Sequence, residues 1–136
     1  METVGNGELL IDTSVLLSHF RDNSKEETEF ERAIHSFDSC FISTITVFEV
    51  EYGAYRAGRS SDLSDILKIV EVLPFGQREA KQAAKIHSKL TEKNKRIGVR
   101  DVFIAGICLA NDLPILTENE DHFNRVDSLR IVEVNT

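Results

Sequence analysis

The sequence predicts an α/β fold, a three-layer α/β/α sandwich around a mostly parallel central sheet. Short apolar runs of the length of a strand alternate along the chain with stretches of helical periodicity. These runs are apolar at nearly every position, as are the strands of a parallel sheet that is covered on both faces. A chain of 136 residues also suits one domain with one real core, so we expect a single domain over residues 1–136.

The first half of the chain supplies two strands and three helices in this interpretation. In order, we expect a strand at 8–12, helices at 14–20 and 24–36, a strand at 40–43 and a helix at 44–58. The last of these helices has a period near 3.6 residues, and Gly58 suits its C-cap.

The second half begins with a helix at 60–70, for which Ser60 or Ser61 would be the N-cap. It continues with a strand at 71–75, a long amphipathic helix at 76–95, a helix at 101–112, a strand at 113–117, a helical turn near 119–123 and a strand at 129–134. The helix at 101–112 is apolar on almost every face and is expected to be buried.

Composition and charge narrow the class of protein. The net charge of −7 argues against a broad phosphate-binding surface, although clustered carboxylates can bind divalent cations and reverse the local sign. No apolar run is long enough to cross a bilayer and no secretory signal is visible, so we expect a cytoplasmic protein with no membrane partner. Cys40 and Cys108 lie in apolar runs and suit small buried hydrophobes.

Four polar positions stand where strands end or helices begin. Asp12 closes the first strand, Glu49 lies in the first turn of the helix after the second strand, and Asp101 opens the buried helix. Asn119 follows the strand at 113–117, with Asp121 nearby. Because the carboxyl ends of parallel strands meet at one edge of the sheet, we expect these side chains to lie near that edge.

Each position also has a simpler structural explanation. Asp12 could cap the following helix, and Asp101 could be a first-turn acid that the helix dipole stabilises. Thr46 to Glu49 and Thr117 to Glu120 both match the capping box S/T-x-x-E. The sequence leaves these alternatives open.

Taken together, the acids favour a metal site. Clustered carboxylates repel one another unless a cation neutralises them, and oxygen ligands without His or Cys suit Mg²⁺ or Mn²⁺. The four histidines show no i,i+4 pair for zinc, and the chain has no GxxxxGK[ST] phosphate loop and no GxSxG elbow. A metal at these acids could activate water and clamp a phosphodiester.

At these residues the sequence resembles a PIN domain, and specifically the VapC-type toxin ribonucleases. LLIDTSVLL is similar to the family's first motif, and ISTITVFEVEYGA, with Glu49 as the motif acid, is similar to the second. IGVRDVFIAGICLAND is similar to the third, and ILTENEDHF to the fourth, T-x-[DN]-x-x-x-F. The four motifs appear in order over nearly the whole chain.

The resemblance implies a PIN-like sheet sandwiched by helices and a Mg²⁺- or Mn²⁺-dependent cleavage of RNA. Carried over by residue, Asp12, Glu49 and Asp101 match the three core acids and metal ligands, and Asn119 falls where the family has Asp or Asn. An amide binds metal more weakly, and Asp121 is a weaker candidate because it is offset by two residues. Three hydroxyl residues would orient the acids, namely Thr13, Ser14 and Thr117.

A locally basic segment, residues 87–101, is either a solvated helix end or a surface that guides phosphates. In the second interpretation, RNA phosphates would be contacted by Lys93, Lys95, Arg96 and Arg100.

Partners follow from the resemblance as well. It implies a homodimer and a small antitoxin that inserts a basic side chain among the acids, which Arg–carboxylate pairing makes reasonable. The alternative function is a PIN-fold interaction module or RNA-processing factor with little or no catalytic activity. A receiver-like signalling domain would need paired acids at the first strand and a lysine at a late strand end, and the sequence has neither.

Overall fold

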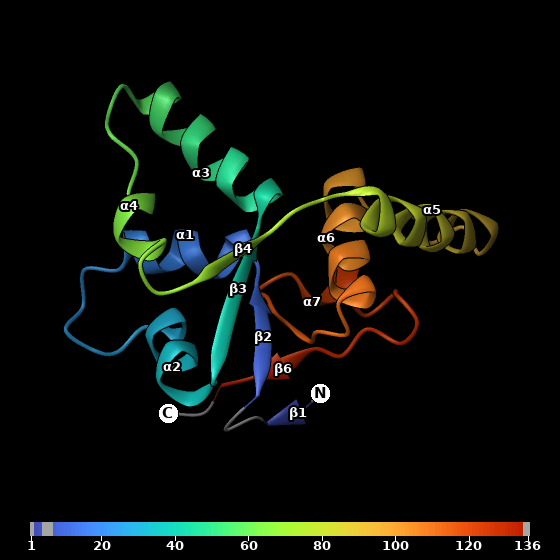
Figure 1. Ribbon diagram of the computed structural model, residues 1–136, viewed down its shortest axis with the longest axis horizontal. Coiled ribbons are helices and arrows are strands. Elements are labelled where there is room, and N and C mark those ends of the chain that lie inside the picture. Colours follow the sequence, from blue (N-terminus) through green and yellow to red (C-terminus); the bar gives the residue numbers. More distant parts are fainter. Residues whose placement is uncertain (1, 4–6, 135–136) are drawn as a thin grey trace.

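A parallel four-stranded sheet runs through the middle of the molecule. The structure is a computed structural model, and it describes residues 2–3 and 7–134. The strands lie in the order β4 (Glu71–Leu73), β3 (Ser39–Ser43), β2 (Glu8–Ile11) and β5 (Ile115–Leu116). Every pairing between them is parallel. Figure 1 shows the sheet nearly edge-on with helices on both sides, so the predicted α/β fold with a parallel central sheet is confirmed.

Strand β2 shows how the sequence builds the layers. Its side chains alternate between the two faces, so Leu9 and Ile11 join one hydrophobic core and Leu10 joins the other. All three are fully buried. A strand that is apolar at consecutive positions is therefore what a sheet with two covered faces requires.

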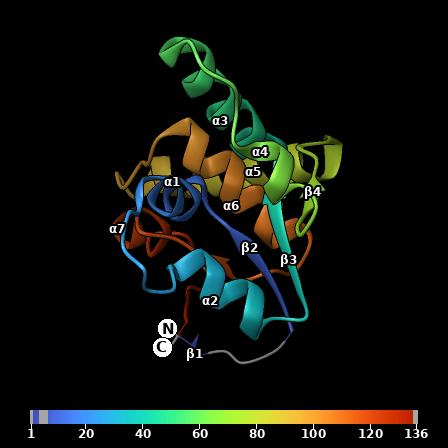
Figure 2. The same cartoon turned by 90° about the vertical axis from the view of Figure 1, so that its left-hand side faces the viewer.

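The helices divide between the two faces. On the first face lie α1 (Thr13–Arg21), α2 (Glu29–Ser36), α3 (Thr44–Ala57) and α4 (Leu63–Ile66), and on the second lie α5 (Gln77–Glu92), α6 (Val99–Ala110) and α7 (Glu120–Phe123). Figures 1 and 2 both show the C-terminal part of α3 extending away from the rest of the molecule. Gly58 ends α3 with a φ of 68°, as the sequence predicted.

Three helices are shorter than expected, among them α5, which covers Gln77–Glu92 where 76–95 was predicted. The helix predicted at 24–36 begins only at Glu29, because Thr28 and Glu31 form a capping box that starts the helix there. The helix predicted at 60–70 is reduced to the four residues of α4. Its N-cap is Asp62, whereas the Ser61 hydroxyl accepts a bond from the Leu63 amide at 3.0 Å.

The C-terminal segment pairs in a way that the sequence did not indicate. Strand β6 (Val132–Glu133) pairs in parallel with β1 (Glu2–Thr3), and a single bridge from Ile115 to Ile131 connects it to β5. Both predicted strands, at 113–117 and 129–134, are therefore shorter than expected.

Helices α5 and α6 pack very closely on the second face. A Cβ at Gly106 would lie 2.8 Å from the Glu79 carbonyl oxygen and 2.9 Å from the Ala83 Cβ. The bare backbone of Gly106 therefore allows the approach.

Over the described residues, no helix has the length and apolar character needed to span a membrane.

Both cysteines are buried, as the sequence predicted. Burial raises the pKa of the Cys40 thiol to about 11. Burial and then the charge of Asp12 raise the pKa of the Cys108 thiol still further. Neither thiol is a reactive nucleophile in this environment.

Candidate active site

The predicted acids gather at the point of the sheet where the order of the strands changes direction. Strand β2 lies between β3 and β5, so loops from both neighbours reach its carboxyl end. In open α/β sheets this crevice is the usual ligand site. Asp12 stands there, directly after β2, and its amide donates to the Leu116 carbonyl at 2.9 Å.

Asp12 is almost completely buried, with 1% of its surface exposed. Its Oδ2 accepts bonds from Ser14 Oγ at 3.0 Å and from Thr117 Oγ1 at 2.8 Å. Although Asp12 occupies the N-cap position of α1, its side chain makes no capping bond. The structure therefore brings Ser14 and Thr117 onto this carboxylate, and the capping alternative does not describe its side chain.

Glu49 lies in the second turn of α3, not in the first as predicted, and its side chain reaches Thr13 of α1. Its Oε1 accepts from Thr13 Oγ1 at 2.6 Å, and the same hydroxyl lies 2.8 Å from Thr46 Oγ1. A hydroxyl can donate only one hydrogen bond. Because Thr13 donates to Glu49, Thr46 must be the donor in the bond between Thr46 and Thr13. Ser43 in turn donates to Thr46 at 3.3 Å, which makes a chain of hydroxyls ending on the carboxylate.

The capping box that the sequence allowed at Thr46 and Glu49 is not formed. Ser43 is the N-cap of α3, and its side chain accepts from the Thr46 amide. Glu49 is therefore free of a capping role. Likewise, Thr117 accepts from the Asn119 amide at 2.9 Å, so no capping box joins Thr117 to Glu120.

Asp101 lies in the first turn of α6 and is 5% exposed. Its Oδ2 accepts from Asn119 Nδ2 at 3.1 Å and lies 2.7 Å from His122 Nδ1. Since a carboxylate oxygen only accepts, His122 carries its proton on Nδ1 in this contact. Asn119, from the turn before α7, thus lies beside Asp101 as predicted from the order of the strands.

Arg100 binds all three acids at once. Its Nη2 donates to Asp12 Oδ1 and its Nε to Glu49 Oε2, each at 2.8 Å, and its Nη1 donates to Asp101 Oδ1. Burial opposes its charge, but the bond to Glu49 and the charge of Asp12 outweigh this effect and raise the pKa of Arg100 above its usual range. The guanidinium is therefore permanently charged.

The other residues predicted for the site lie outside this group. Asp121 is exposed, and its side chain makes no hydrogen bond or ion pair with the described residues. Lys95 and Arg96 are exposed, and Lys93 pairs with Asp127 at 3.2 Å. Of the four cations proposed to contact phosphates, Arg100 is the one that the structure brings among the acids.

The donors suit a hard divalent cation. They are carboxylate oxygens with one amide nearby, the set that favours Mg²⁺ or Mn²⁺. As they stand, no three acidic, His or Cys side chains in the described part of the chain are arranged to hold a metal ion. The acids surround the Arg100 guanidinium instead, a cation of the protein's own.

Sequence reasoning missed two features of this site. His122 was considered only for i,i+4 histidine pairs, yet it lies three residues after Asn119, so one helical turn places both beside Asp101. Arg100 was placed with the surface cations, although its position next to Asp101 in the sequence was a signal for pairing with it.

Comparisons with known proteins identify the family of this chain. The family model of the PIN domain matches residues 9–129. A protein of Rickettsia bellii named Ribonuclease VapC is 30% identical over 133 residues, covering 93% of this chain and 96% of the relative. A protein of Salmonella typhimurium named tRNA(fMet)-specific endonuclease VapC is 27% identical over 128 residues, covering 91% of this chain and 96% of the relative.

A solved structure shares the fold. The structure of DNA-bound VapBC from Salmonella typhimurium matches with a TM-score of 0.76 at 24% identity. The match covers 96% of this chain and 97% of the other.

Proposed function

Because this chain belongs to the PIN-domain family, we propose that it is a divalent-metal-dependent endoribonuclease and the toxin of a toxin–antitoxin pair. It would hydrolyse phosphodiester bonds of RNA in the cytoplasm. The names of its relatives, Ribonuclease VapC and a tRNA(fMet)-specific endonuclease, support the substrate class.

One observation carries the proposal. Asp12, Glu49 and Asp101 come from distant parts of the chain and converge within hydrogen-bonding distance of one guanidinium at the carboxyl edge of the sheet. Burying two carboxylates has an energetic cost that a core residue of similar size would avoid. A cation-dependent reaction gives a reason for that cost.

Each side chain has a role in this proposal. Asp12 and Asp101 would hold the cation, Glu49 would complete its shell or take a proton from water, and Asn119 would hold a water or a second ion. Bound there, Mg²⁺ or Mn²⁺ supplies a Lewis acid that neutralises phosphate charge and makes water more acidic. Bonds from three hydroxyls keep Asp12 and Glu49 in place, those of Thr13, Ser14 and Thr117.

The test is RNA cleavage by the purified chain with Mn²⁺ and with EDTA. We expect cleavage with Mn²⁺ only, and a loss of at least about 100-fold in the Asp101→Asn variant, a typical scale for a metal ligand or its support. The matched control is Asp65→Asn, a similar change at an exposed residue of α4. Intact RNA in every reaction, with Asp101→Asn indistinguishable from the native chain, would refute the catalytic part.

Phosphate guiding remains a proposal for the exposed cations. Lys95 and Arg96 lie in the segment between α5 and the first turn of α6, which carries Asp101. A basic segment that leads to the acids would steer an RNA backbone toward them. Replacing both residues by Gln should weaken RNA binding and lower its dependence on salt.

An antitoxin partner is supported by a hollow beside Glu49. Residues of α1, of α3 and of the loop between α3 and α4 line it, among them Leu17, Phe20, Arg21, Val50, Gly53 and Arg59. A short segment of a partner could lie on its apolar wall and bring a basic side chain to Glu49. Solved neighbours include VapBC complexes, which share the fold.

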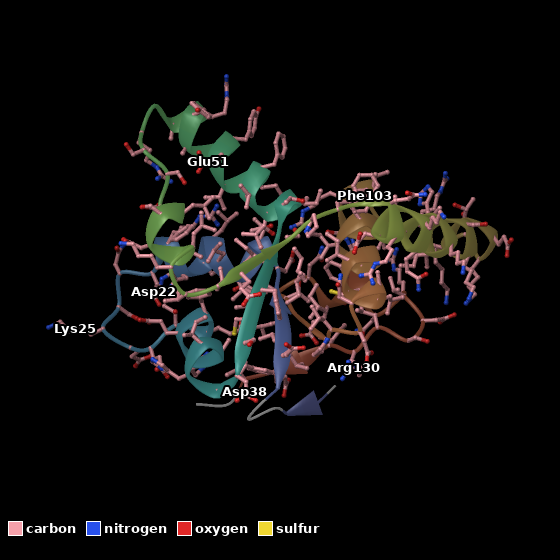
Figure 3. All side chains as sticks on the ribbon, in the orientation of Figure 1. Asp22, Lys25, Asp38, Glu51, Phe103 and Arg130 are labelled. Atoms are coloured by element: carbon pink, nitrogen blue, oxygen red, sulfur yellow. The ribbon has the colours of Figure 1, made fainter. Side chains whose placement is uncertain are left out.

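A homodimer is supported by α3. Phe48, Tyr52 and Tyr55 are each more than half exposed, and Phe48 stacks on Tyr52 with ring centroids 5.9 Å apart. In Figure 3 this helix, marked by Glu51, stands apart from α6, marked by Phe103. Aromatic side chains are typical anchors of interfaces. A monomer by light scattering at micromolar concentration would contradict the dimer.

The alternative is a PIN-fold interaction module with little catalytic activity, or an RNA-processing factor. The ion pairs of Arg100 favour the interaction module, because they neutralise part of the acidic charge without a metal. The cleavage assay above separates the module from the enzyme.

A further inference from the structure

We propose that Arg100 controls how tightly the site binds its divalent cation, because the guanidinium and the cation compete for the same carboxylate oxygens. The inference rests on the proposed function only in taking a divalent cation as the ligand of these acids. It adds that a residue of the chain itself, Arg100, sets the affinity for that cation.

The division of the oxygens is the first argument. Each acid has one oxygen held by a neutral partner or by His122: Asp12 Oδ2 by Ser14 and Thr117, Glu49 Oε1 by Thr13, and Asp101 Oδ2 by Asn119 and His122. The other oxygen of each acid faces Arg100 and has no further partner in the described residues.

These three remaining oxygens all lie within hydrogen-bonding distance of one small planar group. Three N–H groups of Arg100 use them, one for each acid. A cation that binds Asp12, Glu49 and Asp101 together must take these oxygens from the guanidinium. A cation at the centre of the three acids would stand where the guanidinium stands, and two positive charges that close would repel each other.

The carboxylate oxygens become available to a cation only when the Arg100 side chain moves away from them. A guanidinium does not lose its proton near neutral pH, so the site cannot be freed by deprotonation. Arg100 is the second residue of α6 and its side chain is 32% exposed. It can therefore turn toward solvent by changing its side-chain torsions while α6 and Asp101 stay in place.

The consequence is a lower affinity for the cation. When the competent form of a site is populated only in part, the apparent dissociation constant rises by the inverse of that fraction. The three ion pairs keep the acids together before the cation arrives and also oppose its arrival. An antitoxin's basic side chain would meet the same competition.

The experiment is calorimetric titration of Mn²⁺ into metal-free protein, together with the melting temperature in EDTA. If Arg100 occupies the acids nine-tenths of the time, Arg100→Gln should bind Mn²⁺ about tenfold more tightly than the native chain. Its melting temperature in EDTA should fall, because the acids then lack a counter-ion. The control is Arg56→Gln, which removes an exposed arginine of α3 and should change neither value.

A second variant covers the case in which Arg100→Gln does not fold. Arg100→Lys keeps the charge, but an ammonium group lacks the fork that bridges three carboxylates, so its Mn²⁺ affinity should lie between the other two. Equal affinity in the native chain and in whichever variants fold would overturn the inference and leave the proposed enzyme standing. No Mn²⁺ binding by any form, with RNA left intact, would overturn both.

Discussion

Arg100 Nη2 donates to Asp12 Oδ1 across 2.8 Å, although the two residues are 88 positions apart in the chain. Asp12 directly follows the interior strand β2 and Arg100 lies in the first turn of α6, which covers the sheet, so the pair forms only when both layers are in place. The pair therefore couples the geometry of the candidate site to the folding of the domain.

Asp12→Asn should destabilise the metal-free protein. Repulsion among the acids by itself would predict the opposite, but the substitution removes a charged partner from the buried end of the Arg100 network. We expect a loss of about 1–3 kcal/mol in the free energy of unfolding. Urea denaturation in EDTA measures it, with Asp65→Asn as the control for an exposed ion pair of little weight. A variant as stable as the native chain would mean that repulsion and the ion pair cancel.

Thr13→Val should weaken both folding and activity. The valine has nearly the shape of threonine but leaves Glu49 Oε1 without its donor and the Thr46 hydroxyl without its acceptor. Leaving the buried Thr46 hydroxyl and one oxygen of the half-buried Glu49 unpaired should cost about 1–3 kcal/mol of stability. Thr13→Ser keeps the hydroxyl and should retain more RNA cleavage than Thr13→Val. If the two variants cleave equally slowly, the methyl group and not the hydroxyl chain is what matters.

Gly106→Ala should separate α5 from α6. The new methyl group would meet the Glu79 carbonyl at 2.8 Å, and backbone cannot yield as a side chain can. We expect a loss of about 1–3 kcal/mol, typical of overpacking. Gly53→Ala is the matched control, because a Cβ there meets nothing within 4 Å and Gly53 lies inside α3. It should gain about 0.5–1 kcal/mol. Thermal unfolding of both variants would check the opposite signs.

Glu29→Gln should change how stability depends on pH. Burial, and then the charge of Glu118, raises the pKa of Glu29 above its ordinary value of 4.5. The folded state thus binds the proton more tightly than the unfolded state, so this contribution to stability is present below pH 4.5 and is lost as the pH rises through the folded value.

At pH 7 the Gln variant should therefore be more stable than the native chain, and at pH 4 the difference should be smaller or absent. Urea midpoints at both values measure it, with the exposed Glu26→Gln as control. An equal difference at both pH values would show that the charge of Glu29 is not the cause.

Sequence alone determined the layers and the edge at which the site forms. Leu9, Leu10 and Ile11 in a row required two covered faces, and Gly58 marked a helix end, because both depend on neighbours in the chain. The order of strands and helices then assigned Asp12 and Asn119 to one edge of the sheet. These inferences succeeded because periodicity and capping are local properties.

Only the tertiary structure decided which atoms meet. Thr117 reaches Asp12 from 105 positions away, and His122 reaches Asp101 from a turn whose direction no local pattern specifies. Arg100 could have pointed to solvent, as Lys95 and Arg96 do, from the same stretch of chain. It turns inward because three carboxylates from three separate elements meet there, and the attraction exists only once the chain has folded.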